Sequence, residues 1–176
     1  MKDVSVTIDE GEVIGLIGEN GSGKSTLSSI ISGVYPQSEG ELTLDGKPYK
    51  PADTLDAQNH GISMIAQEMG TLPGIKVADN LFIGKEQLFT KHGVVDRKKM
   101  YQEARKALEK IGIDNIHPED PIIKYSLEER KLIEVVRALY TNPRIFIVDE
   151  TTTALSQRGR DIIYQVIKNM KKENKT

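Results

Sequence analysis

The segment that most constrains this chain lies near its amino terminus and reads Gly18-Glu19-Asn20-Gly21-Ser22-Gly23-Lys24-Ser25-Thr26. It fits the spacing G-x-x-x-x-G-K-[ST], the pattern of a phosphate-binding loop between a strand and a helix. The glycines allow backbone angles at which successive amide hydrogens converge on the β- and γ-phosphates. The helix that opens at Lys24 adds its dipole to this attraction. The segment therefore predicts a site for a nucleoside triphosphate.

Two side chains of the loop have expected roles of their own. Lys24 would bring a point charge to the outer phosphates, and the Ser25 hydroxyl would coordinate Mg²⁺. The alternative is a glycine-rich turn that fits the pattern by chance. Because glycine makes up about 7% of average sequences, such a chance match should arise less than about once in a hundred chains. We therefore expect all nine residues to contact the nucleotide.

The segments around the loop predict an α/β fold. Residues 12–17 form a nearly continuous apolar run, typical of a strand buried on both faces of a parallel sheet. Behind the loop, apolar residues recur at helical spacing until Gly33 offers a stop. Residues 40–48 alternate apolar and polar around an Asp45-Gly46 turn, which predicts an antiparallel hairpin. We expect a phosphate-loop core with a mixed, largely parallel sheet and an antiparallel β segment.

The rest of the chain divides into a helical insert and a return to the core. An apolar stretch ending at Gln67 and the run at 145–148 both predict buried strands. Residues 68–140 are mostly of helical or turn character, with a helix expected from about Asp96. The chain is thus expected to be a single domain over 1–176, with a core at about 1–67 and 141–176 and a helical insert at about 68–140.

Composition limits the classes of partner. Hydrophobic residues make up 38% and charged residues 28% of the 176 positions, as in ordinary soluble globular proteins. The formal charge of −2 does not indicate the basic surface that binds nucleic acid. There is no cysteine, and no apolar run approaches the roughly 18 residues of a membrane span. We expect a cytosolic protein that binds no nucleic acid.

A pair of carboxylates follows the apolar run at 145–148. Asp149 would lie at the carboxyl end of a buried strand, where ligands of such sheets usually bind. It could hold Mg²⁺ through water, opposite Ser25. Glu150 would face the attacking water as general base. Strands also often end in solvated charges, but together with the phosphate loop the pair predicts a hydrolytic site.

With these motifs the chain resembles the nucleotide-binding domain of ATP-binding cassette transporters over essentially its whole length. The resemblance is strongest to the first cassette of the ATPases of bacterial ribose- and galactose-type importers. It rests on the stretches Gly61-Ile-Ser-Met-Ile-Ala-Gln-Glu68, Val77-Ala-Asp-Asn-Leu-Phe-Ile-Gly-Lys-Glu86 and Leu132-Ile-Glu-Val-Val-Arg-Ala-Leu139.

The resemblance implies roles and partners beyond those read from the residues. It implies that Gln67 links Mg²⁺ and the attacking water to the helical insert. It implies ATP and Mg²⁺ as ligands, and a second cassette and an integral membrane permease as partners. A periplasmic or surface sugar-binding protein would act indirectly. The chain would lie peripherally on the cytoplasmic face of the membrane and couple ATP hydrolysis to sugar uptake.

Several positions depart from the family pattern. The signature Leu-Ser-Gly-Gly-Gln is replaced by Tyr125-Ser126-Leu127-Glu128-Glu129. Ser126 would act in trans on the nucleotide of the opposite cassette, or it would form a capping box with Glu129, since both have the S-x-x-E spacing. Thr151 stands in place of the expected proline, and Ser156 in place of the expected aspartate.

Two further family features are absent. Residues 1–17 hold no aromatic side chain for the adenine, and no histidine follows Glu150. The chain would then be a fragment that lacks the terminal parts of a full cassette, weakly active or inactive alone. A naturally degenerate cassette that binds nucleotide or permease without hydrolysis is the first alternative. A non-transport ATPase of the same superfamily is the second.

Overall fold

The computed structural model describes residues 4–150 and 155–176. Within these described residues the chain forms two compact units. Unit 1 consists of residues up to Ile65, Thr141–Asp149 and Ile167–Thr176, and unit 2 consists of Ala66–Tyr140 and Glu150–Val166. None of the described helices is long and apolar enough to cross a bilayer.

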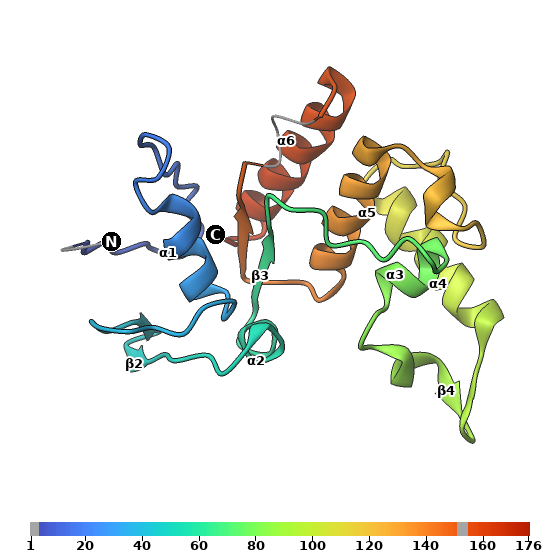
Figure 1. The fold of residues 1–176 in the computed structure, drawn as a ribbon, viewed down its shortest axis with the longest axis horizontal. Helices are drawn as coiled ribbons and strands as arrows, with labels where there is room; N and C mark the ends of the chain where they lie inside the picture. Colours follow the sequence, from blue (N-terminus) through green and yellow to red (C-terminus); the bar gives the residue numbers. More distant parts are fainter. Residues whose placement is uncertain (1–3, 151–154) are drawn as a thin grey trace. The chain divides into compact units, whose positions relative to one another are not determined.

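Unit 1 is built around a parallel pair of strands (Figure 1). β3 pairs with β6 in register from Ile62 opposite Ile145 to Ile65 opposite Val148, which confirms the two strands predicted there. Their predicted burial holds for β3, whereas all four residues of β6 are only partly buried. A small core of Tyr49, Ala57 and Ile62 packs beside this pair. The elements of the unit are α1 (Lys24–Ile31), β1 (Thr43–Leu44), β2 (Lys47–Pro48), α2 (Thr54–Asn59), β3 (Ile62–Ile65), β6 (Ile145–Val148) and the carboxyl-terminal part of α6 (Gln157–Lys172).

The hairpin of β1 and β2 confirms the turn predicted from sequence. The strands are antiparallel, with Thr43 opposite Pro48 and Leu44 opposite Lys47. Asp45 and Gly46 form the turn with φ angles of 52° and 71°. Two successive positive φ angles characterise the two-residue turns whose twist matches that of the strands, and Asp-Gly is a preferred pair for them. The predicted α/β class with parallel and antiparallel parts is confirmed.

Unit 2 is mainly helical and has the larger core. Helix α4 begins after Asp96, whose side chain accepts a hydrogen bond from the Lys99 amide, so the predicted helix start is confirmed. Helix α3 packs on α4 and α5 around a core that includes Phe82 and Ile133. The elements are α3 (Val77–Leu81), η1 (Glu86–Phe89), β4 (Thr90–Lys91), β5 (Val94–Val95), α4 (Arg97–Lys110), η2 (Ile122–Lys124), α5 (Leu127–Tyr140) and the first part of α6.

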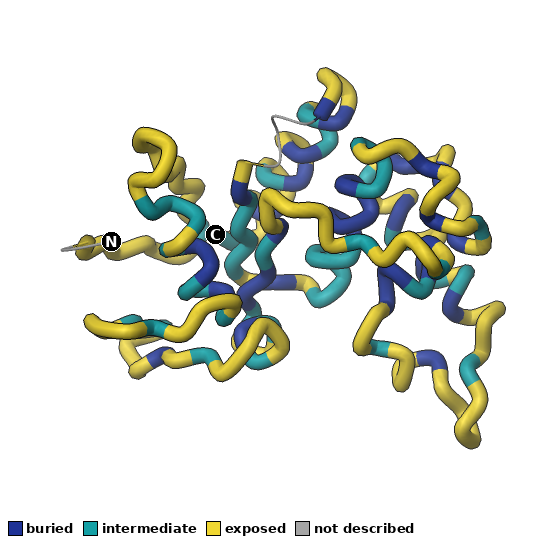
Figure 2. Tube along the Cα trace, in the orientation of Figure 1, coloured by how far each residue is buried: buried dark blue, intermediate teal, exposed yellow. Residues whose placement is uncertain are grey.

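The predicted buried strand at residues 12–17 is wrong. This segment has no strand, and Ile17 is 99% exposed. Figure 2 shows the trace before α1 as exposed almost throughout. A strand is stabilised by a hydrogen-bonded neighbour. Here one edge of β6 is paired with β3, and on its other edge Phe146 donates its amide to the Thr176 carbonyl at 2.9 Å. An apolar run predicts burial only where a neighbouring strand lies beside it.

The helix behind the loop is confirmed, but its buried positions are not the apolar ones. In α1 the buried residues are Ser28 and Ser29, while Leu27, Ile30 and Ile31 are only partly buried. Gly33 ends the helical segment with a φ angle of 74°, as its sequence position predicts.

Candidate nucleotide-binding site

The predicted phosphate loop is folded back on its own lysine. The Lys24 ammonium donates to the carbonyl oxygens of Gly18 at 2.9 Å and Glu19 at 3.0 Å. The Ser22 amide donates to the Glu19 carbonyl at 3.1 Å. These contacts close residues 18–24 into a loop. Two of them are made by the Lys24 ammonium, the group that is expected to bind phosphate.

The start of α1 keeps its amide groups available for an anion. Gly23 is the N-cap residue with a φ angle of 98°, and it supplies no side-chain cap. The first turn holds no acidic residue. A helix amino terminus carries a partial positive charge and unsatisfied amides, which a phosphate can satisfy. The loop, Lys24 and Ser25 therefore fit a phosphate group. Oxygen ligands such as the Ser25 hydroxyl and a carboxylate also fit Mg²⁺.

Asp149 lies where the sequence predicts it, at the carboxyl end of β6. Its amide donates to the Ile65 carbonyl at 3.1 Å, which extends the β3–β6 pairing by one residue. The residue is 8% exposed. Asp149 and the phosphate loop both belong to unit 1, whereas Gln67, Ser126 and Glu150 belong to unit 2.

Glu150 has an unusual backbone for its residue type. Its φ angle is 44°, in the left-handed region that favours glycine, and its side chain is exposed. A non-glycine residue held there costs of order 1–3 kcal/mol, and such residues often cluster at functional sites. The chain therefore turns sharply immediately after Asp149. The prediction for Thr151 lies outside the described residues.

Ser126 and Glu129 form the capping box that one of the two sequence interpretations predicts. The Glu129 carboxylate accepts hydrogen bonds from the Ser126 amide and hydroxyl, both at 2.9 Å. The Glu129 amide in turn donates to the Ser126 hydroxyl at 3.2 Å. The Ser126 hydroxyl thus both donates and accepts a hydrogen bond at the start of α5.

Two sets of polar contacts in unit 2 involve residues for which the sequence predicts no role. Glu128 accepts hydrogen bonds from Ser156, which directly precedes α6. Lys131 and Glu134 form a buried ion pair under the segment that contains Gln67. In the sequence these are two opposite charges at a spacing of three on a helix, which does not distinguish a buried pair from an exposed one.

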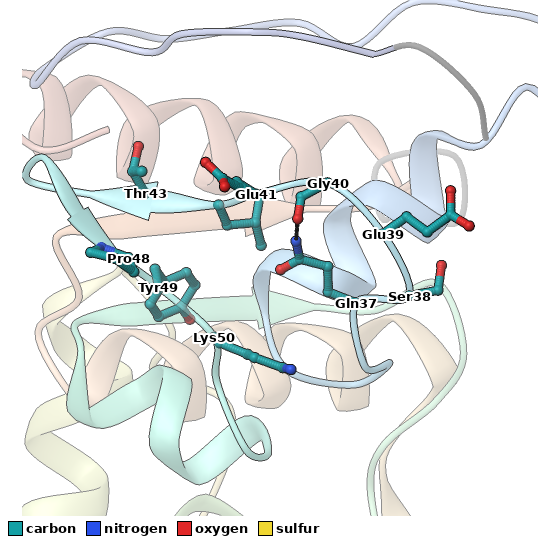
Figure 3. A pocket seen from close by; sticks show the side chains of 10 residues that line it. Gln37, Ser38, Glu39, Gly40, Glu41, Thr43, Pro48, Tyr49 and Lys50 are labelled. Atoms are coloured by element: carbon teal, nitrogen blue, oxygen red, sulfur yellow. Dashed lines mark hydrogen bonds between the residues drawn. The ribbon is translucent and has the colours of Figure 1, made fainter.

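A separate hollow lies beside the β1–β2 hairpin in unit 1 (Figure 3). Its volume is about 310 Å³, and Tyr49 and Lys50 lie on its wall. Gln37 turns back so that its amide nitrogen donates to the Gly40 carbonyl at 2.5 Å. None of the predicted site residues lines this hollow. We assign it no part in binding the nucleotide.

Known proteins resemble this chain in sequence over its whole length. The profile of the ABC transporter family matches residues 1–153. The chain is 38% identical to the ribose import ATP-binding protein RbsA of Caldanaerobacter subterraneus subsp. tengcongensis and 39% identical to that of Shouchella clausii. Both alignments cover 100% of this chain and 35% of the relative. The chain therefore spans about a third of the length of these curated relatives.

Solved structures show the same fold. An ATP-binding cassette of an ABC transporter superposes with a TM-score of 0.79 at 28% identity, covering 98% of this chain and 71% of that one. A nucleotide-free ATP-binding cassette superposes with a TM-score of 0.80 at 26% identity, with the same coverage. These are cassettes with a phosphate-loop ATPase fold. This chain belongs to the ABC transporter family.

Proposed function

We propose that this chain binds Mg-ATP and hydrolyses it as the ATPase subunit of a sugar importer. The observation that carries the proposal is the loop from Gly18 to Lys24, closed at the uncapped start of α1. In the bound state the Lys24 ammonium exchanges its two loop carbonyls for phosphate oxygens, and the loop amides surround the β-phosphate. All nine residues from Gly18 to Thr26 line this site.

Magnesium fits the oxygen donors of unit 1. Ser25 and Asp149 would hold the ion, with Gln67 as a further ligand. Bound Mg²⁺ neutralises charge on the phosphate oxygens. The residues of this chain then bind and orient the nucleotide and exclude misplaced water.

Hydrolysis needs a base next to the attacking water. Glu150 follows the buried Asp149 at a sharp turn of the backbone, and its side chain is exposed. We assign it the role of general base, and Gln67 the role of orienting the water. Ser126 would approach the γ-phosphate bound by a second cassette.

The transport role rests on the relatives. The curated relatives are named ribose import ATP-binding proteins. By extension this chain works with an integral membrane permease and a second cassette, peripheral to the cytoplasmic face of the membrane. A sugar-binding protein outside the cell would deliver the substrate.

The nucleotide site is tested first by binding. Lys24→Ala should abolish Mg-ATP binding, because the only cation of the loop is lost. Lys50→Ala, an exposed lysine of the same unit, serves as the control and should leave the affinity unchanged. Equal affinity of the two variants for Mg-ATP, measured by calorimetry, would refute the phosphate-loop site.

The hydrolytic role is tested separately. In the full chain assembled with its permease, Glu150→Gln should retain ATP binding and lose turnover at this site by about 10²-fold or more. Persistent turnover at this site would refute the general-base role. The isolated chain should show little steady-state hydrolysis, and a robust rate independent of concentration would contradict the need for a partner.

A second candidate is a cassette that binds nucleotide without hydrolysing it. The observation in its favour is the signature segment, where Ser126 is engaged by Glu129 and Glu128 is bonded to Ser156. Carboxylates at a helix amino terminus compete with phosphate, each for about 0.3–1 kcal/mol. The Glu150→Gln measurement decides between the two candidates, because a silent site has no turnover to lose.

A further inference from the structure

One side of α5 holds the segment that contains Gln67. Lys131, Glu134 and Arg137 follow one another at intervals of three residues, so they lie along one side of the helix. The Lys131 ammonium donates to the carbonyl oxygens of Ala66 at 2.7 Å and Glu68 at 3.1 Å. These two carbonyls are the backbone neighbours of Gln67 on either side.

The other two side chains hold the segment a little further on. The Glu134 carboxylate accepts the amide of Gly70, and Arg137 donates to the Gly70 carbonyl at 3.0 Å. A Cβ atom at Gly70 would lie 2.9 Å from the Arg137 guanidinium, so glycine permits this close approach. The backbone from Ala66 to Gly70 is therefore fixed at three alternate residues by one helix.

The ion pair under this segment is fully buried. The Lys131 and Glu134 side chains are each 4% exposed, and their charged atoms lie 2.9 Å apart. With its bonds to Ala66, Glu68 and Glu134, the ammonium uses all three of its donors. A buried ion pair rarely adds stability over apolar residues of similar size. The charges of Lys131 and Glu134 instead hold the segment from Ala66 to Gly70 in one position.

A second anchor follows the first. The Asn80 side chain, 1% exposed in α3, accepts the Leu72 amide at 2.7 Å and donates to the Leu72 carbonyl at 3.0 Å. The segment from Ala66 to Leu72 is thus bound to two helices of unit 2 through its backbone. The Gln67 side chain itself is exposed.

We propose that Lys131 and Glu134 are positioning residues, which fix the backbone around Gln67 so that its amide side chain is presented for the ATPase reaction. Because α5 begins immediately after Ser126, the same helix links the signature segment to Gln67. A shift of α5 then moves Gln67 with it. The inference rests on the proposed function, since Gln67 acts in hydrolysis there.

The test removes both charges at once. In the full chain assembled with its permease, Lys131→Met/Glu134→Gln keeps the size of both side chains and removes both charges of the pair. We expect kcat to fall about tenfold or more while the KM for ATP changes less than about threefold, because the residues that bind phosphate lie elsewhere in the chain. A merely structural role would lower the midpoint of thermal unfolding without this separation of kcat from KM.

The matched control is the pair of Glu103 and Lys106 in α4. It has the same spacing, with the charged atoms 2.8 Å apart, but its Lys106 side chain is 70% exposed. Glu103→Gln/Lys106→Met should leave kcat and KM unchanged. Loss of kcat in this control would also overturn the proposal, because the effect would not belong to the Gln67 segment.

A second variant covers the case in which the double variant does not fold. Glu134→Asp keeps both charges but is too short to reach Lys131 and the Gly70 amide together, and we expect kcat to fall about threefold or more. Retention of kcat within about twofold in either folded variant overturns the positioning role. Absence of turnover in the unaltered assembly would instead refute the proposed function.

Discussion

The Glu128 carboxylate accepts two hydrogen bonds from Ser156, from its amide at 3.1 Å and from its hydroxyl at 2.5 Å. Ser156 directly precedes α6, and its hydroxyl also accepts the Gly159 amide at 3.3 Å. Glu128 belongs to the first turn of α5. One carboxylate therefore joins the starts of two helices in unit 2, at a position where the family signature has glycine.

Replacement of Glu128 should destabilise the chain. Glu128→Ala removes both hydrogen bonds to Ser156 and should lower the free energy of unfolding by about 1–2 kcal/mol, since hydrogen bonds to a charged group contribute more than neutral ones. Denaturant unfolding at neutral pH measures this loss. Glu109→Ala, which removes an exposed carboxylate from α4, is the control and should change the free energy by less than about 0.5 kcal/mol. Equal losses in the two variants would contradict the role of the Ser156 contact.

The capping box at the start of α5 gives a second prediction. Ser126→Ala loses the hydrogen bonds to Glu129 and should cost about 1 kcal/mol of stability. Ser126→Asn should cost much less, because asparagine is as good an N-cap residue as serine. Denaturant unfolding compares the two variants. Ser126→Asn is the control, because it also removes the hydroxyl but keeps a side chain that can cap the helix. If asparagine were as destabilising as alanine, the capping role of Ser126 would be wrong.

Several of the features that could be predicted are set by local interactions. The Asp45-Gly46 turn, the helix start at Asp96 and the Ser126–Glu129 box each depend on residues within a few positions, and all are present. Strand pairing is not local. Residues 12–17 have the composition of a buried strand, yet their environment depends on what lies beside β6. The composition alone carried no information on that neighbour.

The buried charges could not be predicted for a related reason. Lys131 and Glu134 carry opposite charges at a spacing typical of an exposed pair on a helix surface. Their burial depends on the carbonyls of Ala66 and Glu68, more than sixty residues away in the sequence. Burial of a charge follows from its partners, and distant backbone partners leave no pattern near the lysine.

The pKa of Tyr49 gives a prediction on pH. Burial, with a smaller contribution from the nearby Asp56 charge, raises the pKa of Tyr49 from 10.0 to about 12. Its hydroxyl donates to the Ile31 carbonyl at 2.9 Å. A pKa that is higher in the folded state means that this contribution to stability is complete below pH 10 and is lost as the pH rises from about 10 to about 12.

The measurement compares Tyr49→Phe with the unaltered chain across that range. Stability of both falls at high pH as other groups titrate, so the difference between the two unfolding curves is the relevant quantity. The advantage of tyrosine should shrink between pH 10 and pH 12. A constant difference for Tyr49→Phe would mean that the tyrosine is not held neutral by burial.

The last prediction concerns the turn behind α1. Gly33 has a φ angle of 74°, and a Cβ atom there would lie 2.3 Å from the Asp53 carbonyl oxygen. Asp53 is the N-cap residue of α2, so neither backbone can move without disturbing that helix start. Gly33→Ala should cost about 2–4 kcal/mol, because the strain of the left-handed backbone adds to the clash. The measurement is denaturant unfolding.

Gly40 provides the matched control for this clash. Its φ angle is 82°, but a Cβ atom there would meet no other atom within 4 Å. Gly40→Ala should therefore cost only about 1–2 kcal/mol, from the left-handed backbone alone. The difference between the two substitutions isolates the contact of Gly33 with Asp53. If Gly40→Ala is as destabilising as Gly33→Ala, the packing of the α1 turn against the start of α2 contributes nothing to the stability of unit 1.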